Sequence, residues 1–330
     1  MGAETFIGVD VSKDWLDFAV SQHENSLVLK FNFDNTISGY KELIKALRSN
    51  RIVIGKRVLI TLEHTGGYGD NFIRFMVKKK CQVCIESAVR IKKSIGLQRG
   101  KNDSIDAERI LEYTKKNEAT LKLWTLPREP IRLLRDLLSN RERLIRLKNS
   151  MTTPLSILKS THKRHNWLKI KRINQTGIDG LNISIKNIND DINKIVQSDI
   201  EIKKQCDLLK GIPGIGLIIA LQLITRTNEF TRYKTGRELA CLAGVAPFEY
   251  SSGTITGKGH VNFYHNKVLK KYLHMGAVSC INSKSDLKKY YERKVTEGKH
   301  KMLVINNISN KMLLRAAAVI RKGEPYKPML

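Results

Sequence analysis

The chain of 330 residues carries 59 Lys and Arg against 31 Asp and Glu, a formal net charge of +28, and 41% of its residues are hydrophobic. This length and hydrophobic content suit two or three folded domains and exclude a disordered basic tail. The charge excess predicts a polyanionic partner, and nucleic acid is favoured over membrane because the longest apolar run, Leu217–Ile224, is too short to span a bilayer.

The first 118 residues alternate strand and helix patterns. Strands are predicted at Phe6–Val9, Leu16–Val20, Leu27–Phe33, Arg57–Leu62 and Gln82–Ser87, and helices at Ile37–Leu47, Tyr68–Lys80 and Ile105–Lys116. This order predicts an α/β domain built on one sheet with flanking helices.

Beyond residue 128 the patterns become mainly helical. Long helices that form coiled-coil arms are predicted over Pro130–Leu158 and Ile183–Leu209, with a basic, loop-like stretch at His162–Ile178 between them. The turn Gly211–Gly216 resembles a helix-hairpin-helix turn, in which backbone N–H groups at a helix start hold a DNA phosphate. A polar, glycine-rich insert is expected at Ser251–His260.

Four carboxylates stand out by their position. Asp10 and Glu63 each end an apolar strand, while Asp103 and Asp106 lie three residues apart around a predicted helix start and can point the same way. Four converging acids repel one another unless cations neutralise them. Mg²⁺ takes oxygen ligands, and two such ions can clamp the attacking and leaving oxygens of a phosphodiester. Each acid alone also has a structural interpretation, as a helix cap, a helix-dipole residue or a turn residue.

Three blocks containing these acids, Gly8–Lys13, Glu63–Tyr68 and Lys101–Ala107, resemble those of the DEDD transposases of insertion sequences. That family includes Piv-type invertases and bridge-RNA-guided recombinases. The resemblance implies a RuvC-like, ribonuclease-H-type fold and a Mg²⁺-binding tetrad of Asp10, Glu63, Asp103 and Asp106. The nearby acids Asp14 and Asp17 do not match the motif.

A second block runs from Leu242-Ala243-Gly244 through Pro247 to Ser251-Ser252-Gly253. From spacing alone Ser252 is a turn serine. The block resembles the C-terminal domain of the same family, whose catalytic serine falls on Ser252, with Ser251 as the fallback. The resemblance implies a phosphoserine link to DNA. One departure is His265, where the family usually has glycine before the following asparagine.

The sequence therefore predicts an α/β RuvC-like domain over residues 1–128, a helical coiled-coil linker over 129–206 and a mainly α transposase domain over 207–330. The resemblance further implies donor and target DNA, a noncoding guide RNA, and a dimer that assembles to a tetramer. With no signal peptide visible, we expect a cytoplasmic, nucleoid-associated prokaryotic protein. Basic clusters at Lys78–Lys80, Arg90–Lys93, Lys169–Arg172 and Lys267–Lys271 are candidate phosphate contacts or solvated helix faces.

Three hypotheses follow. The first is a serine-dependent, metal-assisted recombinase guided by RNA. The second is a two-metal nuclease of branched DNA in which Ser252 is only structural. The third is a non-enzymatic nucleic-acid-binding protein whose acids are caps and turn residues.

Overall fold

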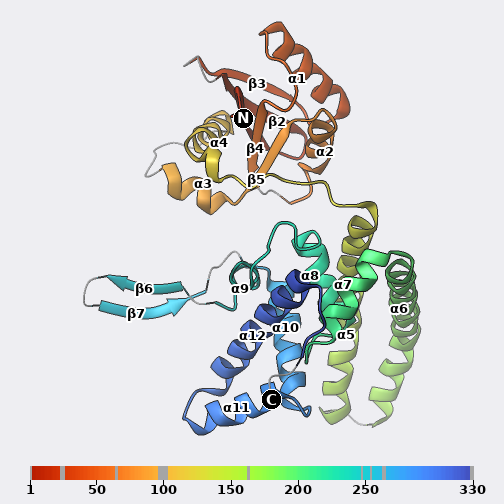
Figure 1. Cartoon of the computed structure of the whole chain (residues 1–330). Helices are drawn as coiled ribbons and strands as arrows, with labels where there is room; N and C mark the ends of the chain where they lie inside the picture. Colours follow the sequence, from red (N-terminus) through yellow and green to blue (C-terminus); the bar gives the residue numbers. More distant parts are fainter. Residues whose placement is uncertain are drawn as a thin grey trace. The chain divides into compact units, whose positions relative to one another are not determined.

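The computed structural model describes residues 2–22, 27–63, 66–95, 103–161, 164–246, 248–252, 255–261 and 265–327. Of these, residues 93, 95, 103, 104, 248–252 and 255–260 are described by their backbone alone. The chain divides into two compact units, Met1–Leu126 and Pro127–Leu330 (Figure 1). Each unit has its own hydrophobic core.

The first unit is a mixed α/β fold around a five-stranded sheet. Its strands are β1 (Thr5–Val11), β2 (Trp15–Gln22), β3 (Leu29–Asp34), β4 (Val58–Glu63) and β5 (Gln82–Glu86), in the order β3-β2-β1-β4-β5. β1, β2 and β3 pair antiparallel in succession, whereas β4 and β5 add parallel to β1. The helices are α1 (Ile37–Ser49), α2 (Asp70–Lys78), α3 (Ala88–Ile95) and α4 (Asp103–Asn117), followed by the 3-10 turn η1 (Glu118–Thr120).

Alternation along the strands sends side chains to two differently covered faces. The larger core lies between one face and helices α1 and α2, with Phe18, Tyr40 and Phe72 fully buried in it. On the other face, Ala107 and Leu111 of α4 pack with small residues such as Ala19. The predicted single sheet with flanking helices is thus confirmed for this unit.

Gly8 sets how closely α4 approaches β1. A Cβ atom at Gly8 would lie 2.3 Å from the backbone oxygen of Ala107 and 2.3 Å from the backbone nitrogen of Leu111. Only a residue without a side chain fits between this strand and this helix. The contact also fixes the face on which Asp10 lies, because Asp10 is two residues further along the same strand.

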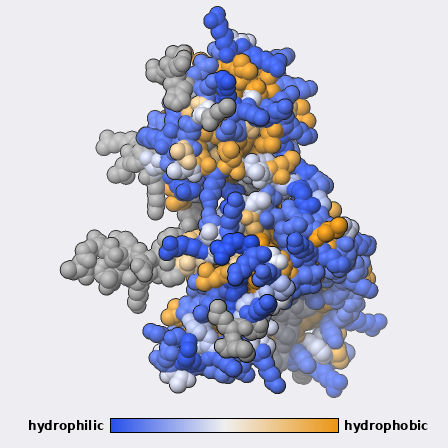
Figure 2. Space-filling model, in the orientation of Figure 1, coloured by the Kyte–Doolittle hydropathy of each residue, from blue (hydrophilic) through white to orange (hydrophobic). Residues whose placement is uncertain are grey.

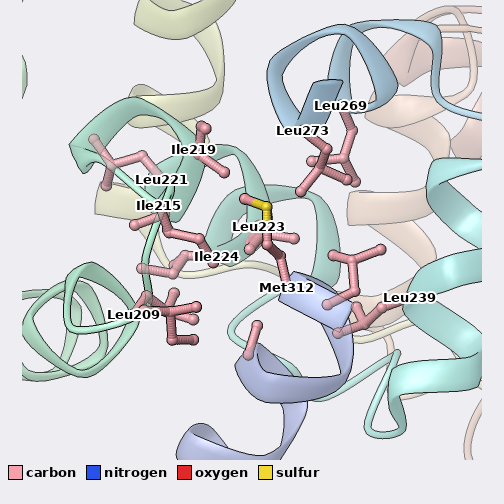
Figure 3. Packing of buried hydrophobic residues seen from close by; sticks show 14 of the residues in the cluster. Leu209, Ile215, Ile219, Leu221, Leu223, Ile224, Leu239, Leu269, Leu273 and Met312 are labelled. Carbon is pink, nitrogen blue, oxygen red and sulfur yellow. The ribbon is translucent and has the colours of Figure 1, made fainter. Parts of the chain in front are cut away.

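The second unit is mainly helical. It contains α5 (Glu129–Thr161), α6 (Arg164–Ser198), α7 (Ile200–Lys210), α8 (Leu217–Thr227), α9 (Gly236–Ala243), α10 (Lys267–Ile281), α11 (Asp286–Thr296) and α12 (Lys301–Lys322), and a hairpin of β6 (Phe248–Ser252) and β7 (Ile255–His260). α5 and α6 form a long helical hairpin and pack along each other (Figure 1). α8 lies at the centre of the remaining helices, where Leu223 and Ile224 meet Leu209, Leu273 and Met312 (Figure 3).

The basic stretch 162–178 was predicted as a loop, and this prediction is wrong for its described part. α6 starts at Arg164 and runs through it, because no proline and no glycine before Gly177 interrupts the helix. Trp167 joins it to α5 by donating from Nε1 to the backbone oxygen of Leu155 at 3.0 Å. The Lys159 and Lys171 ammonium groups lie 5.7 and 5.3 Å from the Trp167 ring centroid.

The predicted helix Ile183–Leu209 is also wrong as a single element. It is interrupted at Asp199, which leaves the helical conformation and caps α7 by accepting a hydrogen bond from Ile202 N at 3.0 Å. The described residues of the polar insert expected at Ser251–His260, namely 251–252 and 255–260, lie in the strands of the β6–β7 hairpin. Aromatic and β-branched residues that favour strands, such as Tyr250, Ile255 and Thr256, alternate with the polar ones there.

The side of the molecule drawn in Figure 2 is mostly hydrophilic over its described surface, with apolar residues in scattered groups. Among the helices that the structure describes, none combines the length and the apolar character needed to cross a bilayer.

The close approach at Gly8 makes a stability prediction. Gly8→Ala should lower the free energy of unfolding of the first unit by about 3 kcal/mol, because the new methyl group meets backbone on both sides. Chemical denaturation followed by circular dichroism measures this. Gly55→Ala is the matched control, since a Cβ there meets nothing within 4 Å, and it should change stability by less than about 0.5 kcal/mol. Equal stability of both variants would contradict the packing of α4 on β1.

Candidate active site

A row of polar residues crosses the sheet at one level. Asp10 of β1 pairs with Asp17 of β2, which pairs with Asn32 of β3. On the other side, Val9 pairs with Leu62, so the next residues, Asp10 and Glu63, continue the two strands side by side. Glu63 in turn pairs with Glu86 of β5. The five residues share the face that α4 covers, since residues paired across a sheet point to the same side.

Two of the predicted acids, Asp10 and Glu63, are therefore neighbours on parallel strands. Both are half-buried. The third, Asp106, lies in the first turns of α4 and forms an ion pair with Arg109, with 2.6 Å between Oδ1 and Nη1. Asp103 is the first residue of the same helix, and its side chain lies outside the described residues.

The pKa of Glu63 reflects its burial and the nearby carboxylate of Asp106 on α4. Burial raises the pKa of Glu63, the Lys92 ammonium group lowers it, and the Asp106 carboxylate raises it, with a net upward shift. The structure therefore brings Asp106 within electrostatic reach of Glu63. It also places Lys92 of α3, a member of the predicted basic cluster Arg90–Lys93, near this carboxylate.

The residue types, half-buried carboxylates, are those that a hard divalent cation takes as ligands. The Asp106 charge raises the pKa of Glu63, a metal ion would relieve this repulsion, and carboxylate oxygens are the ligands that Mg²⁺ prefers. Among the residues whose side chains the structure describes, which exclude Asp103, no group of three or more His, Cys, Asp or Glu is gathered closely enough to hold a metal ion.

Glu86 was not singled out from the sequence, although it ends its strand as Glu63 does. Its Oε1 accepts a hydrogen bond from Ser87 N at 2.9 Å, and its Oε2 accepts from Arg90 Nη1 at 3.0 Å and Tyr113 Oη at 3.1 Å. Burial and the Glu86 charge raise the pKa of Tyr113 to about 12. Glu86 thus ties α3 and α4 to β5 beside Glu63.

Asp17, which the motif leaves out, also has a partner. Its Oδ1 accepts a hydrogen bond from Asn32 Nδ2 at 2.8 Å. Asp17 faces Asp10 across the β1–β2 pair, so it contributes negative charge to the same row without standing at a strand end.

The predicted serine lies in the second unit. Ser252 is the last residue of β6 and pairs with Ile255, and Ser251 pairs with Thr256. Both serines stand next to the hairpin turn, and their side chains, like Gly253, lie outside the described residues. Figure 1 shows the hairpin projecting from the helices of this unit.

The base of this hairpin is firmly attached. Asn266 N donates to the backbone oxygen of Leu242 at 2.7 Å, and Asn306 Nδ2 donates to that of Val245 at 2.8 Å. His265, the departure from the family pattern, packs over Gly244, where a Cβ would lie 2.3 Å from the imidazole ring. The absence of a side chain at Gly244, which has a φ of 63°, accommodates the histidine.

The glycine turn before α8 packs tightly on α10. Gly214 has a φ of 83°, and a Cβ at Gly276 would lie 2.4 Å from the Gly214 oxygen. Gly216 precedes α8 with no side-chain cap, so the first backbone N–H groups of the helix lack that partner. This geometry suits the predicted phosphate contact at the start of α8.

An ion pair between a buried carboxylate and a partly exposed lysine joins α5 to α10. Glu142 is 7% exposed and accepts hydrogen bonds from Lys271 Nζ and, at 2.8 Å, from Tyr272 Oη. Burial alone would raise the pKa of Glu142, but these hydrogen bonds and the nearby positive charges bring it below its usual value. One lysine of the predicted Lys267–Lys271 cluster is thus engaged within the protein.

This pair predicts acid sensitivity of the second unit. A carboxylate whose pKa is lower in the folded state stabilises the protein above its ordinary pKa near 4.5, and this stabilisation is lost as the pH falls through the folded value. Glu142→Gln should cost about 2 kcal/mol at neutral pH and flatten the loss of stability below about pH 4.5. Denaturation curves at a series of pH values measure both effects.

The exposed Glu324 supplies the control, because Glu324→Gln should leave the pH profile unchanged. If Glu142→Gln and the wild type lose the same free energy of unfolding on acidification, the assigned role of Glu142 is wrong.

Comparisons with known proteins relate the chain to transposases of insertion sequences. Residues 7–161 match a family model described as a transposase, that of the IS110 DEDD transposases. Residues 206–292 match the model of the transposase IS116/IS110/IS902 family. The two models together match most of the chain and include Asp10, Glu63, Asp103, Asp106 and Ser252.

Similar proteins include two of full length. The pilin gene-inverting proteins of Moraxella bovis and Moraxella lacunata are each 26% identical over 329 residues, which cover 98% of this chain and 98% of each relative. The protein named "Insertion element IS110 uncharacterized 43.6 kDa protein" of Streptomyces coelicolor is 28% identical over 120 residues, 36% of this chain and 30% of that protein.

Proposed function

Because the chain belongs to the IS116/IS110/IS902 family of transposases, and is therefore an enzyme of DNA recombination, we propose that it mobilises an insertion sequence using a metal-binding acidic site and a serine nucleophile. The observation that carries this proposal is the row that sets Asp10 beside Glu63, with Asp106 acting on Glu63 from α4. The strand order and the acids at the ends of β1 and β4 support a RuvC-like, ribonuclease-H-type fold for the first unit.

In this proposal Asp10, Glu63, Asp103 and Asp106 hold Mg²⁺. The ion would supply neutralisation of the phosphodiester charge during strand exchange. The protein's own part is to keep the four acids on one face, and the Gly8 contact and the Glu86 hydrogen bonds support that role for β1, α3 and α4. Lys92, near Glu63, would attract the DNA backbone toward the acids.

The nucleophile in this proposal is Ser252. Its Oγ forms a bond to phosphorus while the bond from phosphorus to the leaving deoxyribose oxygen breaks, and the serine proton ends on that oxygen. Ser251 remains the fallback. Both residues lie in β6, where Ser252 pairs with Ile255 and Ser251 with Thr256.

The remaining features follow the family resemblance and stay proposals. Residues 129–206 would form a coiled-coil linker, and residues 207–330 a transposase domain whose α8 start holds a DNA phosphate. A noncoding guide RNA would pair with donor and target DNA, and the protein would act as a dimer that assembles into a tetramer. The low aromatic content of 7% fits a protein that delegates base recognition to a guide, and it fits a DNA enzyme that reads shape equally well.

The serine and the acids lie in separate compact units, which keeps the two-metal nuclease as a second candidate. A nuclease needs only the acidic row, whereas the recombinase needs the hairpin as well.

A suicide-substrate assay separates the two. Nicked junction DNA is incubated with Mg²⁺ and the protein with its copurified RNA, and covalent protein–DNA adducts are counted on denaturing gels. Wild type and Ser251→Ala should form the adduct, and Ser252→Ala should lose it by at least about a hundredfold. Asp10→Asn should lose it too, with Asp17→Asn as the matched control that retains it. Cleavage by Ser252→Ala without any adduct in the wild type would establish the nuclease instead.

A further inference from the structure

Helices α5, α8 and α10 gather more positive charge than their ion pairs neutralise. Glu142 of α5 bonds Lys271 and Tyr272 of α10. Around it stand Arg141 and Arg146 on α5, and Arg226 in the last turn of α8. A single buried carboxylate therefore faces four cations.

The guanidinium groups of Arg141 and Arg226 have neutral hydrogen-bond acceptors. Arg226 Nε donates to Gln222 Oε1 at 2.8 Å, and Arg141 Nε donates to Asn189 Oδ1 at 2.7 Å. Arg141 Nη1 also approaches Tyr272 Oη at 3.5 Å. Among the residues that the structure describes, neither arginine has a carboxylate within ion-pair distance, so both retain their charge for an external partner.

A second arginine lies next to Arg226. Arg135 Nη2 of α5 donates to the backbone oxygen of Thr225 at 3.0 Å, which places its guanidinium at the residue preceding Arg226. Burial and the charge of Arg135 both lower the pKa of Arg226, whereas Glu142 and Tyr272 raise it. The half-buried Arg226 guanidinium is repelled by that of the exposed Arg135, and a bound anion would relieve this repulsion.

We infer that Arg226, together with Arg135 and Arg141, binds a backbone phosphate of duplex DNA at the end of α8. The inference rests on the proposed function and locates one of its DNA contacts. A guanidinium offers a planar pair of donors that matches the oxygens of a phosphodiester. The Lys271–Glu142–Tyr272 group supports the site by fixing α5 against α10. Because three helices build it, the site would set the register of the DNA without distinguishing its sequence.

The site lies at the opposite end of α8 from the glycine turn. Leu217 begins this helix and Thr227 ends it, and 11 residues of α-helix span about 16 Å. The two ends of one short helix would therefore contact separate phosphates. A rigid spacer of this kind favours a duplex, whose phosphates keep a fixed spacing, over a flexible single strand.

The test measures binding of a fluorescent 30-base-pair duplex of arbitrary sequence by anisotropy over a range of salt concentrations. Arg226→Gln should weaken binding about fivefold to tenfold at 0.1 M salt and lower the slope of log Kd against log salt by about 1. Without DNA its Tm should equal or exceed that of the wild type, because a repelled charge has been removed. Arg226→Lys should keep the salt slope while weakening binding less.

Arg143→Gln is the matched control, because Arg143 is exposed on α5, two residues from Arg141 and on another side of the helix. Among the described residues, its Nη2 donates a hydrogen bond to Asn140 Oδ1 at 2.6 Å. It should change affinity less than about twofold. An unchanged affinity and salt slope in Arg226→Gln, or a lowered Tm with an unchanged slope, would assign Arg226 to packing and overturn the inference. Weakening seen only with duplex RNA would overturn the assignment to DNA. Failure of the wild type to bind DNA at all would instead remove the proposed function on which the inference rests.

Discussion

The contact between Gly8 of β1 and the backbone of α4 is the constraint on which the first unit depends. The helix approaches so closely that a single methyl group would meet Ala107 and Leu111 backbone atoms at 2.3 Å. This approach brings Asp106, one residue before Ala107, to the sheet face that carries Asp10 and Glu63. The acids are therefore set by backbone packing, which a rigid core holds more accurately than flexible side chains could. Glu86 reinforces the same geometry by bonding Arg90 of α3 and Tyr113 of α4.

The second unit combines a large apolar core with an excess of positive charge. Its apolar core around α8 supplies the stability, while cations gather where α5, α8 and α10 meet. Glu142 neutralises only part of that charge. More carboxylates at this place would stabilise the fold. The excess of positive charge is therefore explained by binding of a polyanion. The serine hairpin is attached at its base through Gly244, Val245 and Asn266.

Much of the first unit could be predicted from its sequence, because apolar runs such as Val58–Leu62 end in acids and alternate with amphipathic helices. Strand pairing could not be predicted, so Glu86 and Asp17, neighbours of Glu63 and Asp10 in the sheet, were missed or set aside. The stretch 162–178 is rich in basic residues, as exposed loops often are, but it holds no proline, and no glycine before Gly177, and its described part is helical. The break at Asp199 was missed because the apolar periodicity continues across it, and only the cap geometry distinguishes two helices from one. The tetrad and Ser252 were inferred from the resemblance to family motifs, and their roles as metal ligands and nucleophile stay predictions.

The proposed divalent-metal site of Asp10, Glu63, Asp103 and Asp106 can be tested without DNA. The measurement is binding of Mn²⁺ to the DNA-free protein, followed by electron paramagnetic resonance with Mg²⁺ as competitor. The wild type should bind Mn²⁺ and release it to Mg²⁺, and Glu63→Gln should weaken that binding by about tenfold or more. Glu112→Gln, on the same helix α4 but outside the acidic row, should bind as the wild type does. Unchanged Mn²⁺ affinity in Glu63→Gln would show that these carboxylates do not share a metal, and would contradict the account of the site.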